Sequence, residues 1–345
     1  MELLNFVIAF FVFIIGLCIG SFLNVVILRA LSGESIVFPP SKCPKCQNRL
    51  KWWHNIPLIS YMLLKGRCAF CHEKISIQYP VIEFLTGYLF LTLYLKFGLT
   101  FNTLFLSIVI SIFIVISAID IKKHIAFDLH SYILAFIGLL FNFFNFGNLY
   151  SGQTYIFNNS FIASILGLLL GAAIIGLYFG LGYIFFKTPI IGVGDIYIAG
   201  AIGACFGWKY IGLIILLAFL IQAIIYIPIF FVKLFNKKDF KTILLLSTFC
   251  IFTGLCFFYT NILRLPANIL YWLFVTVLSI NGFWLCTRII KSLPKNLSEL
   301  NQELMDNTMN DEIPDLSDAG TSEIYHLPFG PALCGSGLIF IFLVL

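Results

Sequence analysis

Two aspartates stand at the ends of apolar stretches, where an ionisable side chain is costly. Asp120 ends the apolar run 111–119. Asp195 follows Gly192 and Gly194 and opens another apolar run. For each aspartate alone, a solvated charge at a helix end is the alternative. An ionisable residue in a membrane segment usually marks a functional site, and two together predict a carboxylate pair that converges on one water molecule.

A carboxylate pair of this kind is suited to amide hydrolysis. Two nearby carboxyl groups share a proton, because like-charge repulsion keeps both from ionising. The ionised member accepts a proton from the attacking water, and the protonated member polarises the carbonyl. A helix N-terminus favours an anion and a C-terminus disfavours it, so we expect Asp195 to be the base and Asp120 the acid. Gly192 and Gly194 allow close backbone approach and leave room for an extended substrate.

Four cysteines form a second chemical motif. They are Cys43, Cys46, Cys68 and Cys71. Two C-x-x-C pairs with 21 residues between them have the spacing of a tetrahedral structural zinc site. Two disulfides are the competing interpretation, which a reducing compartment disfavours. Four thiolates leave no open position for water, so we expect zinc to fold the loop and not to catalyse. We expect His54 and His72 to be solvated loop residues.

The composition identifies the elements that must position these groups. Hydrophobic residues make up 60% of the 345 residues and charged residues 11%, whereas a soluble domain carries about 25% charged residues. An ordinary soluble protein is therefore excluded. We expect an all-α polytopic membrane protein of about eight to ten transmembrane helices with a small cytoplasmic four-cysteine zinc-binding domain. The predicted spans are about 4–28, 80–97, 102–120, 128–147, 160–186, 195–208, 210–232, 242–260, 267–287 and 328–345.

The distribution of Lys and Arg predicts the orientation in the membrane. With the N-terminus outside, 18 of the 21 basic residues fall in cytoplasmic loops, as the positive-inside rule requires. The other three are Lys96, Lys209 and Arg264. We therefore expect a multi-pass protein of the cell inner membrane whose cysteine domain and acidic loop are cytoplasmic. Lys122 and Lys123 then place both aspartates near the cytoplasmic face.

Polar and apolar segments predict six parts of the chain. Half of the 16 acidic residues lie in the segment 291–325, whose scarcity of large apolar side chains is typical of a flexible loop. The parts are 1–29, a first transmembrane helix; 30–79, the cytoplasmic zinc-binding domain; 80–241, a catalytic membrane core; 242–290, an extra transmembrane hairpin; 291–325, the acidic cytoplasmic loop; and 326–345, a C-terminal transmembrane helix.

The chain resembles the type IV prepilin peptidases, which belong to the G-x-G-D class of intramembrane aspartic proteases. Matching stretches run in one order from residue 20 to residue 331. They are Gly20-Ser-Phe-Leu-Asn24-Val-Val-Ile27, Pro39-Pro-Ser-Lys-Cys43-Pro-Lys-Cys46, Trp52-Trp-His-Asn55-Ile-Pro57, Gly66-Arg-Cys68-Ala-Phe-Cys71, Ile75-Ser-Ile-Gln-Tyr79-Pro-Val-Ile-Glu83, Ile119-Asp120-Ile121, Gly192-Val-Gly-Asp195 and Leu327-Pro-Phe-Gly330-Pro331.

The resemblance implies two reactions on type IV prepilin or pseudopilin substrates. One is cleavage after a Gly at the end of a short basic leader. The other is N-methylation of the new N-terminal residue with S-adenosylmethionine as the donor, in the part of the protein formed by the zinc-binding domain and its flanking helices. The residues that the resemblance connects to methyl transfer are Asn24, Asn55 and Glu83. A pairing of Glu83 with a nearby Lys or Arg is the alternative. The expected partners are these substrates and membrane lipid, without nucleic acid.

The chain departs from the family pattern near both aspartates. Ile196-Tyr197 stands where the family usually has a lysine at the second position, and Ala126-Phe127 stands where it has Ile-Pro before Asp128. Gln78 replaces a basic residue before Tyr-Pro. We expect these changes to alter substrate docking or specificity and to leave the aspartate pair intact.

Three other functions compete with the two-reaction enzyme. A peptidase that has lost methyl transfer would keep every motif above. A transporter or channel with functional carboxylates would have paired repeats and carboxylates near the bilayer midplane, whereas these lie at one face. A structural zinc-anchored membrane protein would make the clustering of Gly192, Gly194 and Asp195 an accident.

Overall fold

The structure is a computed structural model that describes residues 2–35, 38, 40–43, 45–123, 128–144, 161–186, 192–236 and 329–343. Within these ranges every regular element is a helix, and β pairing is confined to two isolated bridges in the cysteine loop. The elements are α1 (Glu2–Ser32), η1 (Trp52–Asn55), α2 (Ile59–Leu63), α3 (Gln78–Phe97), α4 (Phe101–Lys123), α5 (Asp128–Phe144), α6 (Phe161–Phe186), α7 (Val193–Phe206), α8 (Trp208–Asn236) and α12 (Gly330–Leu343).

The predicted all-α membrane fold is confirmed. Five described helices are long and apolar enough to cross a membrane, namely α1, α3, α4, α6 and α8. Three shorter apolar helices, α5, α7 and α12, accompany them. Helix α7 has 14 residues and is about 21 Å long, less than a bilayer core of about 30 Å. The predicted spans 242–260 and 267–287 and the acidic segment 291–325 lie outside the described residues.

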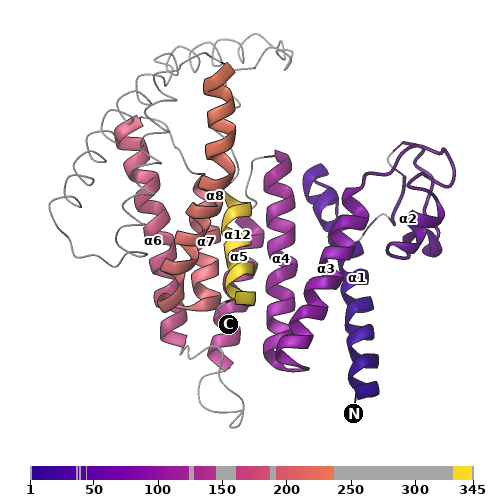
Figure 1. Ribbon diagram of the computed structural model, residues 1–345, viewed down its shortest axis with the longest axis horizontal. Helices are drawn as coiled ribbons and strands as arrows, with labels where there is room; N and C mark the ends of the chain where they lie inside the picture. The colour runs from indigo at the N-terminus through magenta and orange to yellow at the C-terminus, as the bar shows by residue number, and fades with distance from the viewer. Residues whose placement is uncertain are drawn as a thin grey trace, which may run out of the picture. The chain divides into compact units, whose positions relative to one another are not determined.

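The chain divides into two compact units, residues 1–222 with 324–345 and residues 223–323. The described part of the second unit is the end of α8. In the first unit α4 is central, because it contacts α1 and α3 on one side and α5 and α12 on the other (Figure 1). Helix α7 packs against α5, α6 and α12. The two predicted catalytic helices, α4 and α7, therefore share α5 and α12 as neighbours.

Glycines bring the helix pairs into close contact. A Cβ at Gly20 of α1 would lie 2.7 Å from the Cα of Glu83 in α3. In the α6–α7 pair, a Cβ at Gly203 would lie 2.5 Å from the carbonyl carbon of Gly167. Real Cβ atoms do not occur at such distances, so each site requires glycine. Small residues at helix interfaces are how membrane helices approach closely without a hydrophobic driving force.

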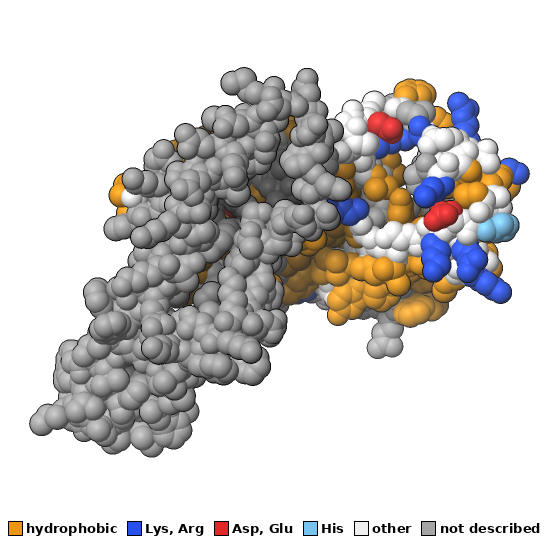
Figure 2. Space-filling view, turned by 90° about the horizontal axis from the view of Figure 1, so that it is seen from above, with side chains coloured by type: hydrophobic (Ala, Val, Ile, Leu, Met, Phe, Trp, Pro, Cys, Tyr) orange, Lys and Arg blue, Asp and Glu red, His pale blue; other side chains and the backbone are white. Residues whose placement is uncertain are grey.

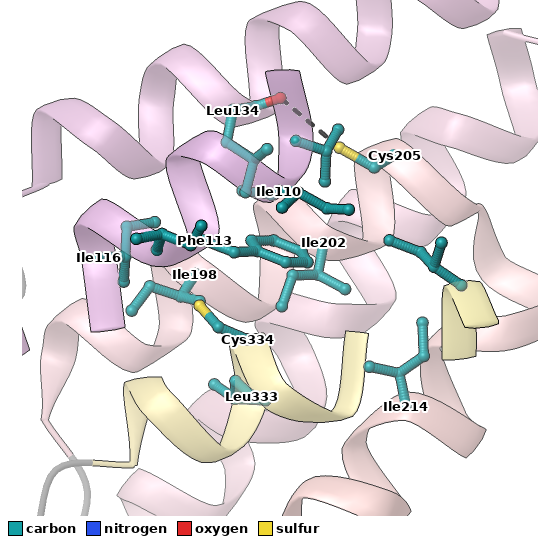
Figure 3. Close-up of a cluster of buried hydrophobic side chains, with 14 of the residues drawn as sticks. Ile110, Phe113, Ile116, Leu134, Ile198, Ile202, Cys205, Ile214, Leu333 and Cys334 are labelled. Atoms are coloured by element: carbon teal, nitrogen blue, oxygen red, sulfur yellow. Dashed lines mark hydrogen bonds between the residues drawn. The ribbon is translucent and has the colours of Figure 1, made fainter. Parts of the chain in front are cut away.

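The apolar core joins the helices that carry the two aspartates. Side chains from α4, α5, α7, α8 and α12 interdigitate, and the thiol of Cys205 donates to the carbonyl of Leu134 at 3.7 Å (Figure 3). The labelled members are Ile110, Phe113, Ile116, Leu134, Ile198, Ile202, Cys205, Ile214, Leu333 and Cys334. Since most of them are fully buried, this packing sets the position of α7 and α12 relative to α4.

A buried polar cluster adds direction to the packing of α5, α6 and α7. The side-chain amide of Asn142 donates to the carbonyls of Gly138 and Ala204, each at 3.0 Å. The hydroxyl of Ser164 bonds to the same Ala204 carbonyl. Because hydrogen bonds, unlike apolar contacts, specify orientation, this cluster fixes how α7 is turned between its neighbours.

Candidate active site

Asp120 and Asp195 are both buried side chains of the membrane helices. Asp120 lies in the last turn of α4 and is 4% exposed; Asp195 lies in the first turn of α7 and is 6% exposed. A solvated charge at a helix end, the alternative left open for each aspartate, does not describe side chains at this level of burial. Burying an unpaired carboxylate is expensive, so partners for both must be found in the fold.

Each of the two carboxylates accepts a hydrogen bond from the backbone amide of a glycine. The N–H of Gly192, the N-cap of α7, donates to Oδ2 of Asp195 at 3.1 Å, and the N–H of Asp195 returns a bond to the Gly192 carbonyl at 3.1 Å. The N–H of Gly330, the first residue of α12, donates to Oδ2 of Asp120 at 3.0 Å. Helix N-termini stabilise negative charge, and each carboxylate lies at a helix N-terminus, that of α7 for Asp195 and that of α12 for Asp120.

The two aspartates lie close enough for their charges to interact. The charge of Asp120 acts on Asp195, and both act on the buried Cys334 of α12. The thiol of Cys334 also bonds the side chain of Ser117, one turn before Asp120 on α4. Helices α4, α7 and α12 thus converge on one buried site. This arrangement can hold a shared proton and direct a water molecule at an amide.

Asp128 lies outside this buried site. It is exposed and opens α5. Nearby, the ring of Tyr197, which replaces the family's lysine, packs against the ring of Tyr132 with centroids 5.4 Å apart. Both tyrosines are partly exposed, so an aromatic pair occupies the position two residues after Asp195, where the family pattern has a cation.

The three residues connected to methyl transfer do not form one cluster of open groups. Asn24 is buried and its amide donates to the carbonyls of Tyr79 at 3.1 Å and Gly20 at 3.3 Å. Asn55 is exposed at the end of η1.

Glu83 of α3 is buried and accepts hydrogen bonds from the protein. The Leu58 N–H donates to its Oε2 at 2.8 Å, and the Ser21 side chain bonds it as well. These partners are an amide and a hydroxyl, whereas the sequence left open a Lys or Arg. Asn24 and Glu83 therefore join α1, α3 and the cysteine loop.

The four cysteines predicted to bind metal come together. The Sγ atoms of Cys43, Cys46, Cys68 and Cys71 all lie within 4.8 Å of one another, a group that can hold a metal ion. Loop residues Trp52–Leu63 separate the two C-x-x-C pairs and contain the two short helices η1 and α2.

Both C-x-x-C pairs fold into the same turn. In each, the residue four positions after the first cysteine has a positive φ, 56° at Gln47 and 57° at His72. Their amides bond the carbonyls of Cys43 at 2.9 Å and Cys68 at 3.1 Å. The amides of Cys71 and Phe70 lower the pKa of the Cys68 thiol from 9.0 to about 7. The thiolate, the form that binds metal, is thereby favoured at Cys68, whereas burial and the neighbouring cysteines raise the pKa of Cys71 to about 11.

The histidines near the cysteines differ from each other. His72 is exposed, as expected of a loop histidine. His54 is half-buried, with ring centroids 5.9 Å from Trp53 and 5.7 Å from Phe70. The expectation of a solvated loop histidine is wrong for His54, because the aromatic residues of η1 and of the second C-x-x-C pair enclose its ring.

The surface of the cysteine loop is strongly basic. Lys and Arg side chains gather over the loop between α1 and α3 (Figure 2). The exposed members are Lys42, Lys45, Arg49, Lys51, Lys65, Arg67 and Lys74. Such a surface faces the cytoplasm in proteins that follow the positive-inside rule.

Known proteins match most of the chain. Residues 14–97 match the family model described as the bacterial peptidase A24 N-terminal domain, and residues 107–227 match that of the type IV leader peptidase family. A protein of Klebsiella pneumoniae named prepilin leader peptidase/N-methyltransferase is 31% identical over 214 residues, which cover 60% of this chain and 89% of that protein. The chain belongs to the type IV leader peptidase family.

Other members of the family carry the same name. One from Myxococcus xanthus is 33% identical over 201 residues, covering 58% of this chain and 57% of the relative. One from Neisseria gonorrhoeae is 38% identical over 153 residues, covering 37% of this chain and 54% of the relative. The chain thus spans little more than half the length of these two leader peptidases. No solved structure matches the chain significantly.

Family membership confirms the resemblance drawn from the motifs, but two residues of the site were missed. The stretch Leu327-Pro-Phe-Gly330-Pro331 resembles a leader peptidase signature, but the resemblance assigns no role to its residues. The amide of Gly330 and the thiol of Cys334 prove to belong to the surroundings of the aspartates. For Gly330 the signal in the sequence was the motif itself, whereas Cys334 lies outside the motif and had no such signal.

Proposed function

We propose that this chain is an intramembrane aspartic endopeptidase that cleaves the basic leader after Gly from type IV prepilin-like proteins. The observation that carries the proposal is the burial of Asp120 and Asp195 on two helices that share α5 and α12 as neighbours, with each carboxylate accepting a hydrogen bond from a glycine amide. Support also comes from the family and from relatives named prepilin leader peptidase/N-methyltransferase. The substrates are type IV prepilins or pseudopilins.

In the proposed mechanism, the aspartates share one proton and activate one water. Asp195 accepts a proton from the water as the water oxygen attacks the carbonyl carbon of the leader Gly. Asp120 donates its proton to the developing oxyanion. Collapse of the tetrahedral intermediate breaks the C–N bond: the amine takes the proton held by Asp195, a hydroxyl of the intermediate returns a proton to Asp120, and the leader leaves with a new carboxyl group. Gly192 and Gly194 add no side chain at the start of α7, where the extended substrate must approach.

The cleavage proposal is tested on the full-length protein in lipid nanodiscs. The substrate is a prepilin-like protein with a basic leader ending in Gly, followed by an apolar helix. Mass spectrometry should find a single cut after that Gly in the wild type. Intact substrate after prolonged incubation, or cleavage at unrelated bonds, would contradict the proposal.

We also propose that the enzyme methylates the amine that cleavage exposes. S-adenosylmethionine would supply the methyl group, and relatives named as both peptidase and N-methyltransferase support the second activity. The described polar contacts of Asn24 and Glu83 are made to the protein. We therefore assign Asn24, with Asn55, to supporting the loop that carries the reaction, and Glu83 both to supporting that loop and to accepting the amine proton. If the wild-type enzyme releases cleaved product that carries no added methyl group, the chain is a peptidase without methyltransferase activity.

The metal at the four cysteines is proposed to be structural zinc. Four thiol groups of soft character suit zinc, and the Sγ atoms already lie within 4.8 Å of one another. With four sulfur ligands the ion has no position for water, so its role is to fold the loop between α1 and α3. By folding the loop, the ion would hold in place the basic surface and the hydrogen bond from the Leu58 amide to Glu83.

The orientation is proposed from the basic surface of the cysteine loop. The chain is a multi-pass inner-membrane protein, and the exposed Lys and Arg of residues 42–74 support a cytoplasmic loop with the N-terminus outside. Both aspartates then lie near the cytoplasmic face. An amine-labelling reagent that cannot cross membranes should modify the exposed Lys65 only after the membrane of intact cells is opened.

A further inference from the structure

Helix α12 comes to the aspartate of α4 from the far end of the chain. Gly330 and Asp120 are 210 positions apart, yet the Gly330 N–H lies 3.0 Å from Oδ2. Gly330 is buried, and it is the first residue of α12. The amide that bonds Asp120 is therefore one of the N–H groups that have no partner within their own helix.

We infer that Gly330 is a positioning residue for Asp120, an inference that rests on the proposed peptidase function. The carbonyl oxygen of a protonated carboxyl group is a better acceptor than its hydroxyl oxygen, so the Gly330 amide favours Oδ2 as the carbonyl oxygen of Asp120. When Asp120 is the protonated member of the pair, the proton then resides on Oδ1. The amide thus decides which oxygen of Asp120 delivers the proton to the substrate carbonyl.

The space at Gly330 makes glycine necessary for this contact. A Cβ there would lie 2.5 Å from Oδ2 of Asp120 and 3.3 Å from Cδ1 of Ile198. The first of these atoms is the end of a flexible side chain, so the least costly response is rotation of the Asp120 carboxyl group. A substitution at Gly330 therefore displaces the catalytic oxygen while the helices can stay packed.

The pair of amides also changes the electrostatics predicted from helix ends. Asp120 lies at the C-terminal end of α4, where negative charge is disfavoured. The N-terminus of α12 opposes that effect, because its first amide points at the same carboxylate. Each aspartate thus has one glycine amide at one helix N-terminus, Gly192 for Asp195 and Gly330 for Asp120.

The test compares Gly330→Ala with Gly335→Ala in the full-length protein. Gly335 lies on the same helix, and a Cβ there would have Ile221 Cδ1 as its nearest neighbour at 3.9 Å, an ordinary contact. In the prepilin cleavage assay, Gly330→Ala should lower kcat by about tenfold or more with KM changed less than about twofold, because misplacing a catalytic atom costs the chemical step. Gly335→Ala should retain wild-type kcat and KM.

Three results would overturn the inference while leaving the peptidase intact: wild-type kcat in Gly330→Ala, an equal loss in Gly335→Ala, or a rise in KM alone. Two other results would instead contradict the proposed peptidase function: absence of cleavage by the wild type, or full cleavage by Asp120→Asn.

A second measurement does not depend on activity or on the folding of a Gly330 variant. Hydrogen exchange is followed in a peptide that holds Gly330 in its interior, in wild type and in Asp120→Ala. Removal of the acceptor should speed exchange of the Gly330 amide by about tenfold or more, while Leu333, whose amide bonds Phe329 at 3.0 Å, stays protected. Unchanged exchange at Gly330 would overturn the inference.

Discussion

The backbone amide of Leu58 donates a hydrogen bond to Oε2 of Glu83 at 2.8 Å, across 25 positions of the chain. Leu58 has a φ of 60°, in a region that branched side chains rarely adopt. Such a conformation costs about 1–3 kcal/mol and persists only where the surroundings impose it. The bond to Glu83 thus ties α2 and the cysteine loop to the membrane helix α3.

The variant Glu83→Gln separates the structural role of this side chain from a chemical one. The new side-chain amide would still offer a carbonyl oxygen to the Leu58 N–H, so leader cleavage should continue at a rate near wild type. Methylation of the product should fall by about tenfold or more, because a group that can accept the amine proton is lost. An α-amino group has a pKa of about 7.7–8.0, so the difference should be largest below neutral pH. Mass spectrometry of the mature substrate measures both steps. Unchanged methylation would remove Glu83 from the reaction.

Loss of either buried aspartate should abolish cleavage. Asp120→Asn and Asp195→Asn remove the ability to share a proton, and kcat should fall by about 100-fold or more without loss of folded protein. Asp128→Asn is the matched control, because Asp128 is exposed at the start of α5, and it should retain most of the activity. Initial rates of leader release provide the measurement. Substantial activity in either buried-site variant would disprove the pair.

Metal analysis should find about one equivalent of zinc per chain, as a single four-thiolate site requires. Cys43→Ser should lower that occupancy by about tenfold or more. Cys18→Ser, in an exposed position on α1 away from the cluster, should leave it unchanged. Chelation should make the loop 42–74 sensitive to protease before the membrane helices separate, because metal binding supplies the folding energy of such loops. Full occupancy in Cys43→Ser would exclude this ligand set.

The stability of the protein should depend on the close glycine contact between α6 and α7. In Gly203→Ala the new Cβ would meet the backbone of Gly167, at 2.5 Å from its carbonyl carbon, so the helices must separate. The free energy of unfolding should fall by about 1–3 kcal/mol, seen as a lower thermal midpoint in detergent. Gly212→Ala on α8, where a Cβ would have no neighbour within 4 Å, should match or exceed the wild type. Equal midpoints for the two variants would contradict this packing.

Local patterns in the sequence predicted the helices and the chemistry of the cysteines. Apolar runs placed the helices around Asp120 and Asp195 because a membrane segment must satisfy its backbone internally and be apolar along its length. The C-x-x-C spacing predicted a metal site because both ligands of each pair lie in one short turn, and the four Sγ atoms do converge. Composition, spacing and motif order therefore determined the fold class, the family and the candidate residues.

Tertiary structure decided the partners of those residues. Gly330 bonds Asp120 across 210 positions, and Leu58 bonds Glu83 across 25. In both bonds the donor is a backbone amide, a group that every residue except proline carries, so no residue type in the sequence marks it. Which amide reaches a carboxylate depends on the distance and rotation at which helices pack. Those are set by many side chains at once, including glycines such as Gly20 and Gly203 whose function is to be small.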